Sequence, residues 1–224
     1  MKGLWVKDLL FLRKQMLAAI LTLILAILSL AFFSQNGIMI GMAIFSVTVS
    51  FLILNSLTLD QQNHGFMYLM TLPFKKKQYV IQKYLLLLFT IICSVILMTI
   101  ISVIFAEITD WNLNLSDIFV RVYGVGLAIL LILIVTTQYQ IKNGPEKAQV
   151  AMSLIGAIVA VVVGGVIALV KYTELGYKVF NQIYTFYMDY GSIPFLVLFT
   201  IVGAAVVSTS CKKSIQMLET MEIQ

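Results

Sequence analysis

The chain has 224 residues, of which 61% are hydrophobic and only 11% are charged, and its formal net charge is +5. Its mean hydropathy is +1.00. A soluble globular domain has about 45–50% apolar and about 25% charged residues, so this composition excludes an ordinary soluble domain. We therefore predict an integral membrane protein with one transmembrane domain over residues 1–224.

The chain begins with a basic amphipathic segment, MKGLWVKDLLFLRKQ. Its apolar residues at helical spacing are Trp5, Leu9, Leu12 and Met16. Lys7 and Lys14 fall on another face of the same helix, with Asp8 beside them. This pattern predicts an amphipathic helix that lies at the membrane interface and leads into the first span.

Six stretches are long and apolar enough to cross a bilayer as helices, which requires about 20 mostly apolar residues. They are residues 16–33, 37–59, 85–106, 118–137, 150–170 and 193–209. The first exceeds the usual signal-peptide core of about 7–15 residues, so we expect it to be retained. Strand-like alternation is absent. The predicted fold class is therefore all-α, with six transmembrane helices.

The connecting segments alternate in charge along the chain. Most Lys and Arg residues lie in the N-terminal segment, the loop 60–84, the loop near Lys142 and the C-terminal tail. The positive-inside rule places this set, and with it both termini, in the cytoplasm. The residues predicted to anchor the chain at the membrane interface and set its orientation are Trp5, Lys7, Lys14, Lys75, Lys76, Lys77 and Lys83.

Small residues recur every four positions in two of the predicted spans. Gly156, Ala160 and Gly164 do so in the fifth span, and Gly37 and Gly41 at the start of the second. This spacing lets helix backbones approach closely in lipid. It predicts helix packing, either inside one subunit or between two, and does not mark a substrate site.

The residue types needed for catalysis inside a membrane are missing. The predicted spans contain no Asp, Glu or His, and no GxxxxGK[ST] phosphate-binding loop occurs anywhere in the chain. His64 is the only histidine, and no Cys/His cluster offers a metal site. We therefore expect no catalytic residues, no metal and no directly bound cofactor. The lack of buried ionisable groups also argues against proton coupling.

The loop 60–84 is the longest predicted cytoplasmic connection. Its first part, DQQNHGFMYLMTLP, predicts a short helix with an apolar face that ends near Pro73. After Pro73 a second helix begins and continues directly into the third span. The lysines that follow keep this loop on the cytoplasmic side and pair with anionic lipid headgroups. The short amphipathic helix before them, presented to the cytoplasm, suits the groove of a partner protein.

Four segments resemble the type-2 ATP-binding-cassette permeases, in their small six-span bacterial subfamily. They are MKGLWVKDLLFLRKQ, TLPFKKKQYVIQKYL, KNGPEKAQ and STSCKKSIQMLE, and they occur in the family's order over the whole chain. The sequence departs from the family pattern at three of these positions. Lys75 stands where Ser is common, Lys76 where Arg is common, and Gln149 where the family often has Arg.

The resemblance implies two permease copies, identical or homologous, with two ATPase subunits that bind ATP and magnesium. It also implies a bacterial plasma membrane location. In that family the helix between the second and third spans couples the ATPase to the membrane helices. The residues assigned to this coupling segment are Asp60, His64, Phe66, Met67, Leu69, Met70, Leu72 and Pro73.

The spans carry no acidic residue or histidine, and Arg121, near the start of the fourth, is their only charged residue. This apolar character favours an amphipathic or antimicrobial peptide, or another hydrophobic compound, as the exported cargo. One alternative is a non-transporting membrane anchor or signalling partner that recruits a cytoplasmic protein through the same loop. An intramembrane enzyme is less favoured, because its acids and bases are missing.

Overall fold

The computed structural model describes residues 2–62, 76–111, 113–174, 176–179, 181–182, 185, 191 and 193–220. Within these residues the chain is helical and contains no strand, as predicted. The helices are α1 (Lys2–Lys14), α2 (Met16–Phe33), α3 (Gly37–Gln61), α5 (Lys76–Ile108), α6 (Leu115–Asn143), α7 (Pro145–Tyr172) and α9 (Ile193–Thr220), with a short 3-10 turn, η1 (Ser34–Asn36), between α2 and α3.

Each of the six stretches predicted to cross a bilayer lies within one of these helices. Among the described residues, four segments are long and apolar enough to span a membrane. They are Met16–Gln61, which contains both α2 and α3, together with Lys76–Ile108, Leu115–Asn143 and Pro194–Glu219. The chain is therefore a membrane protein of several apolar helices, and the count of six spans stays a prediction.

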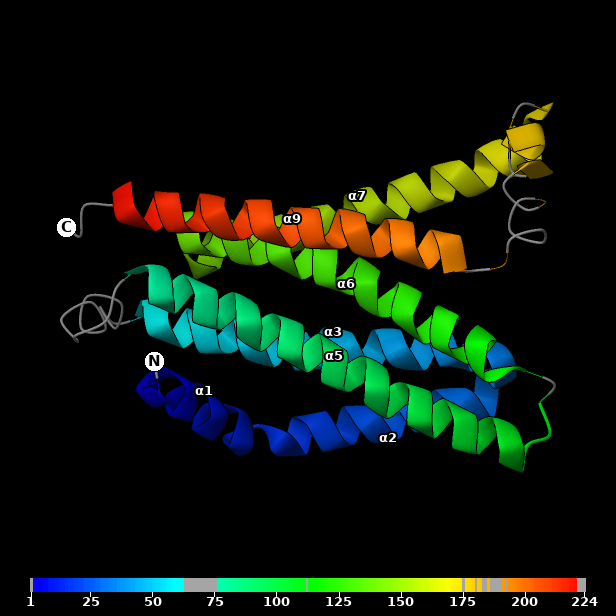
Figure 1. Cartoon of the computed structure of the whole chain (residues 1–224), viewed down its shortest axis with the longest axis horizontal. Helices are drawn as coiled ribbons and strands as arrows, with labels where there is room; N and C mark the ends of the chain where they lie inside the picture. Colours follow the sequence, from blue (N-terminus) through cyan, green and yellow to red (C-terminus); the bar gives the residue numbers. More distant parts are fainter. Residues whose placement is uncertain are drawn as a thin grey trace.

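The long helices run antiparallel along a bundle (Figure 1). The start of α1, the end of α3, the start of α5 and the end of α9 lie together at one end of it. We call this end the basic end, because Lys77 and Lys142 belong to it by their positions on α5 and α6. Glu107 and Asp117 belong to the opposite end. These positions are compatible with the charge alternation along the chain, and the orientation of the chain in a membrane stays a prediction.

Two breaks in the helical path follow from local chemistry. Gly144 has a φ of +84° and donates its N–H to the carbonyl of Gln140 at 2.9 Å, which ends α6. Pro145 then occupies the first turn of α7, where its missing N–H costs no hydrogen bond. The sequence NGP therefore turns the chain back within three residues.

The α2–α3 hairpin is held by a close backbone approach at two glycines. A Cβ atom on Gly37 would lie 2.2 Å from the carbonyl oxygen of Ser29, and one on Gly41 would lie 2.9 Å from that of Ala26. Ser29 Oγ donates to the Gly37 carbonyl at 3.1 Å, which bonds the two helices directly. The prediction of close helix packing at Gly37 and Gly41 is confirmed.

The amphipathic helix predicted at the N-terminus exists as α1, but a different face points inward. Leu4 and Asp8 are buried, Trp5 and Leu12 are partly buried, and Leu9 is 51% exposed. The expectation that Asp8 lies with the lysines on a polar outer face is wrong, whereas the exposed Leu9 does not contradict its predicted place on a face turned to the membrane. The reason is that α1 packs against α3 and α5, which offer polar groups to Asp8.

The outer helix α7 packs mainly against α6, and Figure 1 shows it at the edge of the bundle. A Cβ atom on Gly156 would meet nothing within 4 Å, so this glycine makes no close approach inside the described part of the chain. The packing role predicted for Gly156, inside one subunit or between two, stays a prediction. The surroundings of Ala160 and Gly164 lie outside the described side chains.

We predict that Gly37→Ala destabilises the protein and that Gly124→Ala does not. The new methyl group at position 37 would overlap the Ser29 carbonyl, and overpacking of this kind costs about 1–3 kcal/mol. Gly124 lies on α6 with open space around it, where alanine favours a helix by roughly 0.5–1 kcal/mol. Thermal unfolding of both variants in detergent measures the difference, and equal midpoints would contradict the packing described for the hairpin.

Candidate functional site

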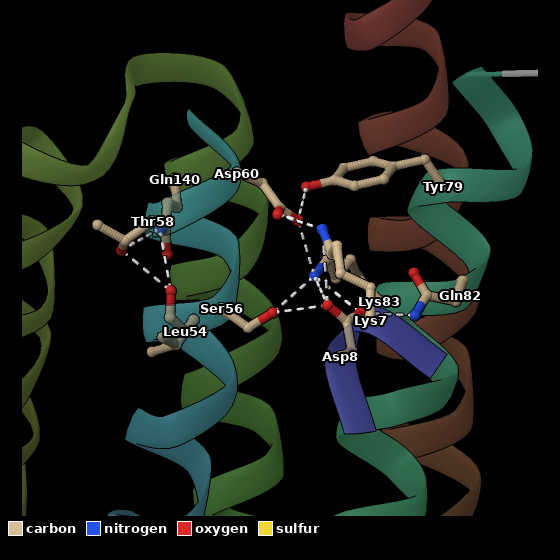
Figure 2. Close-up of polar contacts among 10 residues, drawn as sticks. All are labelled: Lys7, Asp8, Leu54, Ser56, Thr58, Asp60, Tyr79, Gln82, Lys83 and Gln140. Atoms are coloured by element: carbon tan, nitrogen blue, oxygen red, sulfur yellow. Dashed lines mark hydrogen bonds and ion pairs between the residues drawn. The ribbon is translucent and has the colours of Figure 1, made fainter. Parts of the chain in front are cut away.

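A cluster of charged side chains is buried at the basic end, where α1, α3 and α5 meet. Its members are Lys7 and Asp8 on α1, Asp60 on α3 and Lys83 on α5, and we call these four residues the charge cluster. Asp8 is 0%, Lys83 1% and Asp60 7% exposed, whereas the Lys7 side chain is 39% exposed. Figure 2 shows the four side chains converging between the three helices.

Helical spacing explains how neighbouring groups reach the same site. Ser56 and Asp60 are four residues apart on α3, so both lie on the side that faces α5. Tyr79, Gln82 and Lys83 are spaced by three and four residues on α5 and likewise share one face. All five side chains contact the charge cluster or belong to it.

The Asp8 carboxylate is fully saturated with hydrogen bonds. Lys83 Nζ lies 2.9 Å from each of its oxygens. Ser56 Oγ donates to Asp8 Oδ1 at 2.8 Å, and Gln82 Nε2 donates to Oδ2 at 2.6 Å. A carboxylate has about four acceptor sites, so these contacts occupy all of them. Asp8 therefore fixes α1 to both α3 and α5.

The second carboxylate, Asp60, joins α3 to α5. Lys83 Nζ lies 2.9 Å from Asp60 Oδ2, and Tyr79 donates its hydroxyl to the same oxygen at 3.0 Å. Lys7 Nζ donates to Asp60 Oδ1. Lys83 also lies 5.6 Å from the centre of the Tyr79 ring. One ammonium group, on Lys83, therefore bridges the two carboxylates, and the four charges sum to zero.

Charge compensation keeps Asp8 ionised despite its burial. Burial by itself raises the pKa of this carboxyl group, but the charge of Lys83 and the hydrogen bonds from Lys83, Gln82 and Ser56 outweigh it, so the pKa is lowered from 3.8. Breaking a buried ion pair by removing one partner is strongly destabilising, because it leaves the other charge uncompensated. Removal of one buried member of the charge cluster is therefore expected to destabilise the protein.

Polar contacts also tie the neighbouring helices to the same end. Gln140 Nε2 on α6 donates to Thr58 Oγ1 at 2.9 Å (Figure 2). Gln61 Nε2 donates to the backbone carbonyl of Gln140 at 3.0 Å. The hydroxyl groups of Tyr84 on α5 and Ser214 on α9 lie 2.8 Å apart. The final turn of α3 and the first turns of α5 are thus linked to α1, α6 and α9.

The site residues predicted from sequence have different outcomes. Asp60 lies in the charge cluster at the last turn of α3, but the rest of the coupling residues fall outside the described part of the chain: His64, Phe66, Met67, Leu69, Met70, Leu72 and Pro73. Lys75 is outside it as well. The described ends that flank this segment are Gln62 and Lys76.

Lys83 was predicted to anchor at the membrane interface, and the structure places it in the interior instead. Its ammonium group points into the gap between α1 and α3, where two carboxylates compensate it. The other predicted interfacial lysines with described side chains are more accessible: Lys77 and Lys14 are exposed, and Lys76 is partly buried, with Nζ donating to the Leu218 carbonyl at 3.1 Å.

Sequence reasoning missed the charge cluster as a unit. It treated Asp8 as one member of a polar face and Lys83 as one of several topological lysines. The available signal was the recurrence of polar residues at spacings of three and four beside apolar ones, at Ser56 and Asp60 and at Tyr79, Gln82 and Lys83. This spacing indicates which residues share a face on each helix, but it does not predict that the faces of different helices are in contact.

Comparison with known proteins gave one match. The model of a family described as "ABC-2 family transporter protein" matches residues 3–219 of the chain. No curated protein and no solved structure matches. The matched range covers α1 through nearly all of α9 and therefore includes the whole charge cluster.

We predict that Lys83→Met destabilises the protein by about 3–5 kcal/mol, because it leaves buried Asp8 without its main counter-charge. The matched control is Lys77→Met on the exposed face of α5, for which a change within about 0.5 kcal/mol is expected. Chemical denaturation in detergent measures both.

A double variant tests whether the pair acts as described. Asp8→Asn combined with Lys83→Met removes both charges, so it should be more stable than Lys83→Met alone. If the two substitutions instead add independently, the buried pair does not couple and the account of the charge cluster is wrong.

Proposed function

Because this chain belongs to the ABC-2 transporter family, we propose that it is the transmembrane permease subunit of an ATP-driven exporter in a bacterial plasma membrane. The match over residues 3–219 and the apolar helices support a transporter permease. Its energy would come from a separate ATPase subunit that binds ATP and magnesium, since the chain has no phosphate-binding loop of the GxxxxGK[ST] type. The permease itself would carry no catalytic residue.

The charge cluster is the observation that carries this proposal. It joins the last turn of α3 to the first turns of α5, and these two helices flank residues 63–75. A force applied to that segment by a partner would therefore reach both helices together. The bonds to α1, α6 and α9 would spread it to the rest of the basic end.

We place the ATPase on the segment 60–84, at the basic end and on the cytoplasmic side. The orientation rests on the positive-inside rule, because the basic residues gather where α1, α3, α5 and α9 meet. The contact itself would be made by the apolar residues Phe66, Leu69 and Met70. Closure of the ATPase would then shift the permease between inward-open and outward-open forms.

The assembly and the cargo complete the proposal. We infer two permease copies, identical or homologous, because the resemblance to type-2 ATP-binding-cassette permeases implies a pair of permease subunits. Six spans would put both termini on the same side of the membrane, and the positive-inside rule makes that side the cytoplasm. The cargo would be an amphipathic or antimicrobial peptide, or another hydrophobic compound, because the predicted spans carry no Asp, Glu or His.

We predict that Phe66→Asp and Leu69→Asp each abolish co-purification of a P-loop ATPase with the tagged chain. A carboxylate cannot enter an apolar groove without losing its hydration. Gln216→Asp, at an exposed position of α9 outside the segment 60–84, is the matched control for added charge and should retain the ATPase.

Failure of that experiment has a definite meaning. If no ATPase accompanies even the unaltered chain, or if both aspartate variants retain it, the docking assignment is wrong. A different cytoplasmic protein captured through the same segment would instead support a membrane anchor or signalling scaffold.

We predict that Tyr79→Phe weakens the coupling of ATP hydrolysis to transport without releasing the ATPase. The change deletes one hydrogen bond to Asp60 and keeps the Lys83 contact, so the stability loss is about 1 kcal/mol. Pull-down and transport by the reconstituted complex measure binding and coupling separately. Tyr139→Phe, an exposed tyrosine on α6, is the control. If Tyr79→Phe transports the same amount of cargo per ATP as the unaltered protein, the charge cluster does not couple ATP hydrolysis to transport.

We predict that amphipathic peptides stimulate ATP hydrolysis by the reconstituted complex and accumulate on the far side of the vesicle membrane. A small hydrophilic peptide of equal length serves as the control and should do neither, because the apolar spans offer it no favourable environment. If neither peptide has an effect, the cargo assignment fails while the permease assignment stands.

A further inference from the structure

The structure contains an apolar groove in the middle of the bundle, away from the charge cluster. It lies between α5, α6 and α9 and has a volume of about 410 Å³. All of its lining residues fall inside the stretches predicted to cross the bilayer. This volume is near the lower end of the range for ligand sites, roughly 300–1,000 Å³. The groove is therefore large enough for one hydrocarbon chain but not for a bulky solute.

Small residues on α9 create the groove. At Gly203 an added Cβ atom would lie 3.0 Å from the Leu127 side chain, so α9 approaches α6 closely there. Ala204 is the next residue and lines the groove. Because its side chain is a single methyl group, it leaves space between α9 and the residues of α5 and α6 that also line the groove.

The chemistry of the walls excludes a polar occupant. Among the described residues that line the groove, none is charged and only Tyr123 and Thr200 bring a side-chain oxygen. Thr200 Oγ1 donates to the Val197 carbonyl of its own helix at 2.7 Å. A peptide backbone placed here would bring N–H and C=O groups that these walls cannot satisfy, which is costly at membrane depth. A hydrocarbon chain brings none.

The groove is also continuous with the apolar surface that faces the membrane. Ile92 and Ile96 line it and are each more than half exposed. Ile100 follows Ile96 by four residues on the same face of α5, and it is exposed as well, as is Ile201 on α9 outside the groove lining. A lipid lying against the bundle can therefore reach the groove sideways, without passing through a polar region.

We propose that this groove is a binding site for one acyl chain of a bilayer phospholipid, which fills the space between α9 and the α5–α6 pair. The bound chain would support the packing of α9 at its narrowest residues, Gly203 and Ala204. The site is independent of the ATPase and of the exported cargo, so it stands or falls separately from the proposed function.

Native mass spectrometry of the detergent-purified full chain tests the site. The unaltered protein is expected to retain one phospholipid per groove. Ala204→Leu fills the groove and should lose that lipid, whereas Ala205→Leu adds the same volume at an exposed neighbouring position and should keep it. No retained lipid in the unaltered protein, equal retention in both variants, or a retained detergent or non-lipid molecule would overturn the proposal.

A second measurement on the unaltered chain guards against misfolding of the leucine variant. The protein is reconstituted in phosphatidylethanolamine and phosphatidylglycerol vesicles in which some lipid carries a diazirine group on the acyl chain. Cross-links are expected to concentrate at Ile92, Ile96 and Ala204 and to be fewer at exposed Ile100 and Ile201. An even distribution over all five positions would mean ordinary lipid contact and no bound chain.

Discussion

Two carboxylates and two ammonium groups share one largely water-excluded site, and the basic end of the bundle depends on their mutual compensation. Asp8 and Lys83 are both essentially inaccessible to solvent. Neither could be buried alone at an acceptable cost, because an isolated charge loses its hydration without recovering it. Three helices must therefore come together at once: α1 supplies Lys7 and Asp8, α3 supplies Asp60 and Ser56, and α5 supplies Lys83.

This requirement gives the two regions of the molecule different properties. At the basic end, directional bonds specify which groups meet, and few arrangements satisfy all of them. In the middle of the bundle, packing is apolar and depends on shape, as at Gly37 and Gly41 between α2 and α3 and at Gly203 between α9 and α6. The polar contacts of the charge cluster fit the proposed transmission of movement at the basic end. The apolar contacts at Gly203, with the groove beside them, fit the proposed entry of a lipid.

Much of the fold was predictable because hydropathy and helical length are properties of short segments. The helix Met16–Phe33 has the predicted bounds, and Gly144 with Pro145 marks the α6–α7 turn. The α1 helix was also predictable, but the face it presents inward was not. The pattern puts Asp8 beside the lysines on a polar face, but the structure buries it among polar groups of α3 and α5. Periodicity assumes an apolar partner surface, and here the partner surface is polar.

The sequence by itself determined a membrane protein of apolar helices, the alternation of charge between the two ends, and the glycines that let α2 meet α3. Each of these follows from composition or from spacing within one segment. Only the tertiary structure decided that Lys83 is buried between helices, that it bridges Asp8 and Asp60, and that a Cβ atom on Gly156 would meet no described atom within 4 Å. The physical reason is that the free energy of a charge or a small residue depends on what lies opposite it, and that neighbour comes from a distant segment.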